Sequence, residues 1–389
     1  MDPPHFPNDS GIESRWFLLN QVTVGPPIPF YSLMVPPMRF SILAFLLTLS
    51  TALVVGPVVT VRAQAPCNCE PLSAECEDCD PWCNMCPCTY GVVEGLFMDR
   101  NNRSADRPLV QELGSTIDPT PLRTLLSTGD LNPDVGAGMR VLVGTRLNEC
   151  WAVELGYFGI FGQTANSSVV LEDLILIPGD LGLNVNNFVA ADRADIQYST
   201  NLQSAEANLV RCNCCCDCDI NCRSAEWLLG FRYLNLDERF SLTAVDSAES
   251  STRYAVRTQN HLFGAQVGSR LRRCYGRWSV EGTGKAGLYA NDASQSADAI
   301  IDFDNFERRP AVSSSTGQVA FVGELNLTGV YQINSCWGLR AGYNLLWVEG
   351  VALAPDQLDF TFTPTSGTAI VSNGGVFMHG VSAGVEARF

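Results

Sequence analysis

The chain has very little positive charge. It contains one lysine, Lys285, and three histidines, and its 25 lysine and arginine residues stand against 41 aspartate and glutamate residues, which gives a net charge of −16 at pH 7. A chain without a basic patch is a poor nucleic-acid binder. Long apolar runs are equally scarce. Apart from Phe40 to Val61, no stretch stays apolar for the roughly eighteen residues that a transmembrane helix needs. We therefore expect neither nucleic-acid binding nor a helical membrane domain.

The end of the chain alternates in polarity without a break. Every second residue from Phe377 to Phe389 belongs to a mostly apolar row, and small or charged residues occupy the positions between them. This period of two predicts one strand with two different surroundings. A transmembrane β-barrel needs such a strand, because lipid contacts one face and a polar lumen the other. A strand of a soluble sandwich is the alternative that this segment alone leaves open.

The alternation recurs after cysteine-containing turns. Four such turns precede alternating strands that contain a tryptophan near their start, and these tryptophans predict an aromatic girdle at one membrane interface: Trp151, Trp227, Trp278 and Trp337. Strands running in the opposite direction lie between them, and the segment 196–211 must supply one of these although its alternation is poor. Counted together, the strands in both directions predict an all-β fold: a closed antiparallel transmembrane β-barrel of about ten strands over residues 89–389.

The connections differ in length on the two sides of the predicted barrel. The turns that carry Cys150, Cys274 and Cys336 are short, whereas four other connections are long and polar: Arg103 to Asp134, Gln163 to Asp195, Asn291 to Thr316 and Val351 to Gly375. Outer-membrane barrels have short periplasmic turns and long extracellular loops. This pattern predicts that both termini lie in the periplasm.

Across the predicted strands, the alternate positions that are not apolar include charged residues of both signs. We expect these side chains to point into the lumen, where opposite charges at this density tend to pair: Glu154, Arg232, Glu281, Lys285, Glu324, Arg340, Glu386 and Arg388. Ten strands are slightly more than the eight at which side chains fill a barrel and far fewer than the sixteen of open porins. The predicted lumen is therefore narrow.

Three segments precede the predicted barrel. Residues 1–37 are rich in proline and have no strand or helix pattern, which indicates a non-native or disordered extension before the true start. Residues 38–65 have a basic residue, an apolar run and a small-residue cleavage site, as a secretory signal peptide does. A single membrane anchor is the alternative for this run. Residues 66–88 are rich in cysteine and are expected to form an irregular periplasmic segment.

All sixteen cysteines lie beyond the proposed cleavage site, which predicts an oxidising compartment and disulfide bonds. The disulfide candidates are Cys67, Cys69, Cys76, Cys79, Cys83, Cys86, Cys88, Cys150, Cys212, Cys214, Cys215, Cys216, Cys218, Cys222, Cys274 and Cys336. The spacing of Cys76, Cys79, Cys83 and Cys86 also suits a metal or iron–sulfur site, although it differs from zinc-ribbon and ferredoxin patterns. A thioredoxin-like use of Cys83 and Cys86 lacks the βαβ context. We expect disulfides and no metal or cofactor.

Three enzyme-like motifs have ordinary structural explanations. Gly282 to Gly287 matches a dinucleotide-binding pattern but lies within a predicted strand with no following helix. Gly380 to Gly384 matches a nucleophile elbow, yet no histidine or aspartate follows its serine. His261 and His379 fall on the lipid-facing parity, where a general base would meet no substrate. We expect no enzymatic activity.

Four segments resemble one known family. The sequences EGLFMDRNN (94–102), SAEANL (204–209), GFRYLNLDE (230–238) and AGYNLLW (341–347) are similar to the beta-barrel porin family of planctomycete bacteria. The resemblance implies an outer-membrane β-barrel and says little about the solute. At the C-terminus, Ser382, Gly384, Ala387 and Phe389 resemble the signal read by bacterial barrel-assembly machinery.

Two functions remain open from the sequence. The first is a small passive, porin-like channel for ions or small solutes in the outer membrane. The second is a structural or surface-anchoring barrel without transport, crosslinked to itself or to other periplasmic proteins by disulfides. Outer-membrane lipid and the barrel-assembly machinery are the expected partners in both cases.

Overall fold

The barrel is the part of the chain that the structure describes. The computed structural model describes residues 89–102, 106–114, 120–148, 150–213, 223–246, 250–302 and 304–388. The predicted segments 1–37, 38–65 and 66–88, the cysteines from Cys67 to Cys88 and from Cys214 to Cys222, and Phe389 lie outside these residues.

Ten strands form the closed antiparallel barrel that the sequence predicts. Each strand pairs with its neighbours along the chain, and the last strand pairs with the first, which closes the ring. The strands are β1 (Thr89–Asn102), β4 (Gly136–Arg146), β5 (Trp151–Leu176), β6 (Val189–Asn213), β7 (Arg223–Val245), β8 (Ser251–Tyr275), β9 (Trp278–Ala297), β12 (Val312–Gln332), β13 (Trp337–Val351) and β14 (Gly374–Arg388). The poorly alternating segment 196–211 is strand β6, so its assignment as a strand is confirmed.

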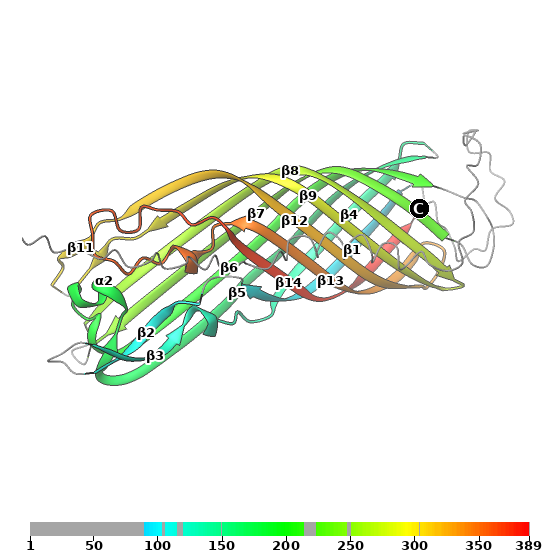
Figure 1. Ribbon diagram of the computed structural model, residues 1–389. Helices are drawn as coiled ribbons and strands as arrows, with labels where there is room; N and C mark the ends of the chain where they lie inside the picture. The colour runs from blue at the N-terminus through cyan, green and yellow to red at the C-terminus, as the bar shows by residue number, and fades with distance from the viewer. Residues whose placement is uncertain are drawn as a thin grey trace, which may run out of the picture. The chain divides into compact units, whose positions relative to one another are not determined.

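Smaller elements gather at one end of the barrel. They are β2 (Pro108–Leu113), β3 (Pro121–Ser127), η1 (Thr128–Asp130), α2 (Gly179–Asn184), β10 (Ile300–Ile301), β11 (Glu307–Arg309) and η2 (Ala354–Gln357). We call this the loop end, and the opposite end, where short turns join β4 to β5, β8 to β9 and β12 to β13, the turn end. Strand β14 ends at the turn end, next to the start of β13 (Figure 1). No described helix is long and apolar enough to span a membrane.

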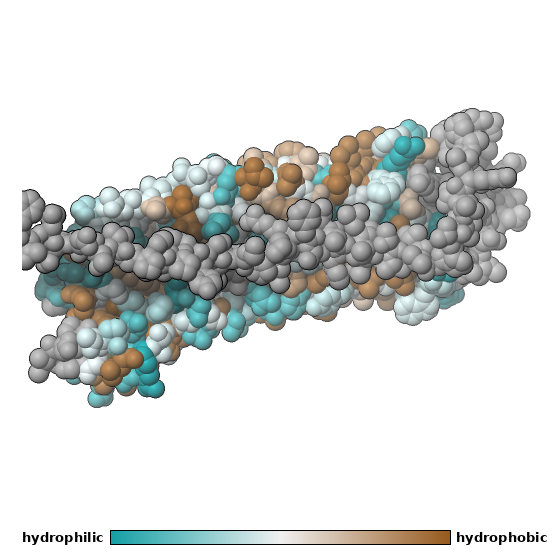
Figure 2. Space-filling model, in the orientation of Figure 1, coloured by the Kyte–Doolittle hydropathy of each residue, from teal (hydrophilic) through white to brown (hydrophobic). Residues whose placement is uncertain are grey.

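The polarity of the wall reverses along each long strand, and β8 shows this most clearly. Near the turn end, Phe263 and Val267 face outward with 48% and 60% of their surface exposed, and Gln266 is buried inside. Beyond Phe263 the same alternate residues face inward, but they now include large apolar side chains such as Tyr254 and Val256 alongside the polar Thr258 and Asn260. On the visible face, hydrophobic side chains are concentrated toward the turn end and hydrophilic ones toward the loop end (Figure 2).

Two of the four predicted loops are largely strand, so this part of the prediction was wrong. Strand β5 continues to Leu176 and β6 begins at Val189, while β9 continues to Ala297 and β12 begins at Val312. These extensions alternate too, but their apolar residues point into the barrel instead of outward; Ala165 and Ala194 are examples, 5% and 0% exposed. The prediction from sequence assumes that the outward-facing residues of each strand are apolar. Segments whose outward-facing residues are polar were therefore assigned as loops.

Candidate functional site: the barrel lumen

The inward side chains near the turn end are charged. All eight residues that the sequence assigns to the lumen lie inside the barrel and are buried or nearly so: Glu154, Arg232, Glu281, Lys285, Glu324, Arg340, Glu386 and Arg388. They come from β5, β7, β9, β12, β13 and β14, because the polar parity of every strand points inward. These residues form a layer of charge across the lumen, which we call the charged layer.

Ion pairs in the charged layer connect strands that are not neighbours. Arg232 of β7 lies 2.5 Å from a carboxylate oxygen of Glu324 on β12. Arg340 of β13 pairs with Glu281 of β9 at 3.1 Å and with Glu94 of β1 at 2.9 Å. Such pairs link opposite parts of the wall, and removing one partner would leave a buried charge unpaired. The charged layer therefore braces the barrel.

Six further charged residues complete this layer, and the sequence analysis did not single them out. They are Glu94, Arg140, Glu206, Glu226, Arg270 and Arg272. Arg270 contacts Glu154 at 2.7 Å, and Lys285 contacts Glu206 at 2.5 Å. A signal for them was present, since Arg270 and Arg272 alternate with outward Leu271, and Arg140 lies between two outward apolar residues of β4.

A small cavity remains between the charged side chains. It has a volume of about 110 Å³ and is lined by residues of the charged layer together with Tyr90. This volume holds a few water molecules at most. The described charged side chains therefore leave little open space between them at this level.

Above the charged layer, apolar side chains fill the lumen. They form one contiguous buried cluster, the apolar layer: Leu96, Met98, Phe158, Ile160, Leu202, Leu234, Leu236, Leu262, Tyr289, Ala320, Val322, Leu346, Val348, Val351, Leu353, Val376 and Met378. Every barrel strand except β4 contributes to it. Strand β4 has Gly136 at this level, where an added Cβ would lie 2.6 Å from Ile160 and 2.4 Å from Gln163. The missing side chain leaves room for its neighbours, so the layer is continuous across the barrel.

The connection between β13 and β14 folds into the loop end of the barrel. We call residues 352–373 the plug segment. Its first part, from Ala352 to Leu358, is buried, and Leu353 belongs to the apolar layer. The element η2 contacts β7 and β8, which lie across the ring from β13 and β14. The prediction that Val351 to Gly375 is a loop is correct, but its first part lies within the barrel and not in the surrounding solvent.

Side chains of the wall strand β8 and of the connection before β2 bind the backbone of the plug segment. The Asn260 amide donates to the carbonyl oxygen of Ala352 at 2.8 Å and accepts from its backbone N–H at 2.8 Å. The Arg107 guanidinium donates to the carbonyl oxygen of Leu358 at 3.1 Å, and the Tyr254 hydroxyl accepts from the backbone N–H of Asp359 at 3.0 Å. These bonds satisfy backbone groups that would otherwise be buried without partners. The plug segment is therefore built into the wall.

A buried ion pair anchors the same segment. Glu238 of β7 pairs with Arg100 of β1, and both side chains are fully buried. The second carboxylate oxygen of Glu238 accepts the backbone N–H of Ala354 at 2.8 Å. The Tyr198 hydroxyl donates to Glu238 and accepts from Arg100, in both cases at 2.9 Å. This group fixes the plug segment where the apolar layer ends.

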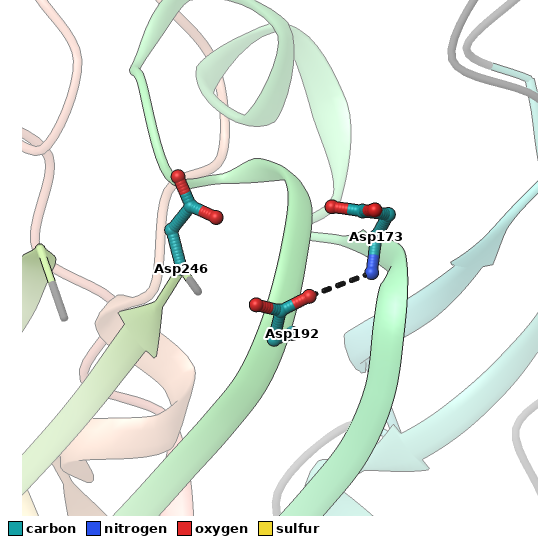
Figure 3. Close-up of side chains that lie close together, drawn as sticks. All are labelled: Asp173, Asp192 and Asp246. Carbon is teal, nitrogen blue, oxygen red and sulfur yellow. Dashed lines mark hydrogen bonds between the residues drawn. The ribbon is translucent and has the colours of Figure 1, made fainter. Parts of the chain in front are cut away.

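Three carboxylates lie close together outside the lumen, near the loop end. Asp173, Asp192 and Asp246 each place an oxygen within 4.8 Å of the others (Figure 3). Asp192 accepts the backbone N–H of Asp173 at 2.8 Å. Exposed acidic groups often lie this close together without binding an ion.

The predicted girdle residues lie near the turn end. Trp151, Trp278 and Trp337 are the first residues of their strands, and Trp227 is the fifth residue of β7. Trp227, Trp278 and Trp337 expose 63%, 60% and 46% of their surface. Cys150, Cys274 and Cys336 lie at the same end. The disulfides proposed for these cysteines stay predictions.

Both described histidines face outward and pair with tyrosine. His261 Nδ1 lies 2.9 Å from the Tyr233 hydroxyl, and His379 Nδ1 lies 2.9 Å from the Tyr343 hydroxyl. Within residues 89–388, as far as these are described, no histidine enters the lumen. The three positions of the C-terminal signal that are described, Ser382, Gly384 and Ala387, all lie in β14.

Several solved outer-membrane proteins have a similar but distant architecture. The outer membrane protease OmpT from Escherichia coli is 8% identical, with a TM-score of 0.40, over 77% of this chain and 96% of that chain. The Pseudomonas putida toluene transporter TodX is 10% identical, with a TM-score of 0.24, over 78% of this chain and 90% of that one. A Pseudomonas aeruginosa FadL homologue is 8% identical, with a TM-score of 0.23, over 77% and 90%. These scores carry no argument about activity.

Comparison with protein families gives a firmer result. No curated protein sequence matches the chain. The model of the family described as "Putative beta barrel porin-7 (BBP7)" matches residues 105–389, which is most of the chain and nearly all of the barrel. This match agrees with the closed ten-stranded wall and its outward apolar band, which are typical of an outer-membrane β-barrel. The chain belongs to this family of porin-like outer-membrane β-barrels.

Proposed function

We propose that the protein is a structural outer-membrane barrel that does not conduct in the state described. The apolar layer carries this proposal, because nine of the ten strands fill one level of the lumen with buried apolar side chains. Water and ions pass such a level only at a high desolvation cost. The charged layer and the plug segment support the same conclusion from either side.

Liposome swelling tests the proposal directly. Liposomes that contain the purified full chain should shrink in a hypertonic solution of a small sugar or salt and should not re-swell. Protein-free liposomes are expected to behave in the same way. A sixteen-stranded porin at the same protein-to-lipid ratio is the positive control. Re-swelling at a rate that rises with the amount of this chain would refute a closed barrel.

A small passive channel is the second candidate function. The observation that favours it is the connection between β13 and β14, because the plug segment is held by hydrogen bonds to wall side chains and is not itself a wall strand. A segment held in this way can move out of the lumen without breaking the hydrogen bonds between the barrel strands. Conductance that appears only after the plug segment is released would support this function.

We also propose the orientation that the connections suggest. The turn end would face the periplasm, and the cysteines there would form disulfides within the chain or with periplasmic partners, so that the barrel anchors other components. Residues 38–65 would act as the signal peptide for export. A membrane-impermeant thiol reagent should then leave the cysteines of the turns unlabelled in intact cells, even after mild reduction. Surface labelling of Cys150, Cys274 or Cys336 would reverse this orientation.

We infer no enzymatic activity for the barrel. The outward His261 and His379 are occupied by hydrogen bonds to tyrosine and lie away from the charged layer. A general base must come within hydrogen-bond reach of a substrate proton. Replacement of both histidines by glutamine should leave every measurable property of the inserted barrel unchanged, and a loss of any hydrolytic activity in the double variant would contradict the inference.

A further inference from the structure

The outer wall formed by β8, β9 and β12 changes from apolar to polar in a single step. The strand register places three residues side by side at each level. The last apolar row comprises Phe263, Ala290 and Val319, and the next row toward the loop end comprises His261, Asp292 and Gly317. Val319 exposes 73% of its surface and Phe263 exposes 48%. Exposed apolar side chains at this density belong in lipid, so the step marks the edge of the apolar band.

A hollow lies on the same wall, directly beyond this edge. It has a volume of about 350 Å³ and is lined by the next two outward rows, together with Gln295 and Ser314, which lie between those rows in β9 and β12. These rows comprise Gln259, Ser294 and Ser315, and then Arg257, Ser296 and Ser313. The hollow exists because four short serine side chains lie beside two longer ones. Four to six residues of a tilted strand place it roughly 10–15 Å beyond the last apolar row, which is headgroup depth.

Charged and amide groups form a fixed rim on one side of the hollow. Asp237 of β7 accepts hydrogen bonds from the Arg257 guanidinium at 2.6 Å and from the Gln259 amide at 3.3 Å. Arg239 lies directly opposite Arg257 in the strand register and is exposed. Like charges in this position destabilise a sheet. A ligand with electron-rich oxygens would relieve that repulsion.

The chemistry of the hollow selects one class of ligand. Its lining offers hydroxyl, amide and guanidinium groups and no apolar side chain. A peptide or an acyl chain would gain little there, whereas a sugar presents hydroxyls that both donate and accept hydrogen bonds. Its position next to lipid makes a membrane lipid the most direct source of that sugar. The acyl chains of such a lipid would lie against Phe263 and Val319.

We propose that this hollow binds the saccharide headgroup of a glycolipid in the leaflet around the loop end. Arg257 and Gln259 would contact the sugar oxygens or a phosphate attached to them. The short serine side chains would leave space for the sugar ring. The site lies on the outer wall, so it does not depend on whether the lumen conducts. It gives a membrane-anchoring barrel a specific lipid partner.

Native mass spectrometry of the full chain released from nanodiscs tests the proposal. Rough-type lipopolysaccharide is the probe, and phosphatidylglycerol is the matched anionic lipid without sugar. The wild-type barrel should retain the glycolipid at least about tenfold better than phosphatidylglycerol. Ser296→Trp and Ser313→Trp fill the hollow and should abolish that preference. Arg257→Gln should reduce it.

Two controls separate this site from general effects. Ser199→Trp adds the same bulk in the same row but on β6, outside the hollow, and should leave the preference intact. Arg239→Gln removes a neighbouring charge that does not line the hollow and should have a smaller effect than Arg257→Gln. Each variant must first show the heat-dependent gel mobility of a folded barrel. Equal retention of both lipids by the wild type, or an equal loss in Ser199→Trp, would overturn the proposal.

Discussion

On β8, Phe263 and Val267 face outward in the half near the turn end, whereas Tyr254 and Val256 face inward in the half that projects toward the loop end. Both halves belong to one strand with one unbroken alternation. In the first half the apolar residues contact lipid, and in the second they form a core with the loops. The surroundings, and not the backbone, therefore determine which parity carries the apolar residues.

The two halves also fill their interiors differently. Near the turn end the outward side chains contact lipid and are apolar, so the inward side chains are polar and are stabilised by ion pairs across the lumen. Toward the loop end the outward parity faces water, so the inward parity packs as an ordinary apolar core around the plug segment. The apolar layer joins the two interiors.

The largest expected effect comes from breaking the charged layer. Arg232→Met removes one partner of Glu324 and of Glu206, so the buried Glu324 keeps only Arg140 and the buried Glu206 keeps only Lys285 as a countercharge. The free energy of unfolding, measured by urea titration in lipid vesicles, should fall by about 3–5 kcal/mol.

The matched change near the loop end is Arg123→Met. Arg123 pairs with Glu112, but its side chain is 70% exposed, so the loss should be at most about 1 kcal/mol. Equal losses in the two variants would show that the charged layer does not brace the barrel.

The next effect concerns the outer surface. Val267→Arg places a charge in the apolar band and should lower the free energy of unfolding by about 2–4 kcal/mol. Gln197→Arg, on the outward face of β6 in the projecting half, should change it by less than about 0.5 kcal/mol. The same vesicle titration measures both. If the two changes cost the same, the apolar band does not end at Phe263.

A smaller effect is expected at the anchor of the plug segment. Glu238→Gln removes the countercharge of Arg100 and weakens the bond to the Ala354 N–H, which should cost about 1–3 kcal/mol. Hydrogen–deuterium exchange should accelerate in residues 352–358. Asp237→Asn changes the adjacent outward residue and should leave this exchange unaltered. Faster exchange in both variants would mean that the plug segment is not anchored through Glu238.

The smallest effect is a pH dependence in the outer part of the plug segment. Burial acts to raise the pKa of Asp359, but hydrogen bonds from Thr361 and from the Gly367 N–H, with the charge of Arg309, hold that pKa below its usual range. The resulting stabilisation is present above the usual aspartate pKa and is lost as the pH falls through the lowered value. Exchange in residues 361–367 should therefore accelerate only in acid.

A control variant identifies the group responsible for that pH dependence. Asp359→Asn cannot ionise, so its exchange rate in the same residues should be the same at neutral and acid pH once the intrinsic chemical rate is removed. An acid-dependent acceleration that persists in the variant would assign the effect to another carboxylate.

Much of the fold followed from the period of two. The alternation from Phe377 to Phe389 and after each girdle tryptophan predicts strands that the structure contains, and the number of strands is confirmed. The projecting parts of β5, β6, β9 and β12 were missed because their polarity is reversed, so the apolar-outward pattern does not match them. In β6, inward Leu202 and outward Gln203 obscure the pattern even near the band.

The lumen could be predicted only in part. Parity indicates which charges face inward, but ion pairs such as Arg232 with Glu324 depend on strand tilt and on the size of the ring. The apolar run Val351 to Ala354 joins the end of β13 to the plug segment and was a usable signal of burial. Its contacts with Asn260 and Glu238 join residues about 90 and 116 positions apart, and no local pattern encodes such pairs.

The central claim is that the apolar layer, and not the plug segment alone, closes the lumen. The most direct test is planar-bilayer recording of a variant in which a short glycine–serine linker replaces residues 352–372, after its folded state has been verified by gel mobility. Our account predicts no discrete conductance steps, because the wall side chains of the apolar layer remain in place. Regular, voltage-independent steps from this variant, absent from the wild type, would contradict it and would establish a channel gated by the plug segment.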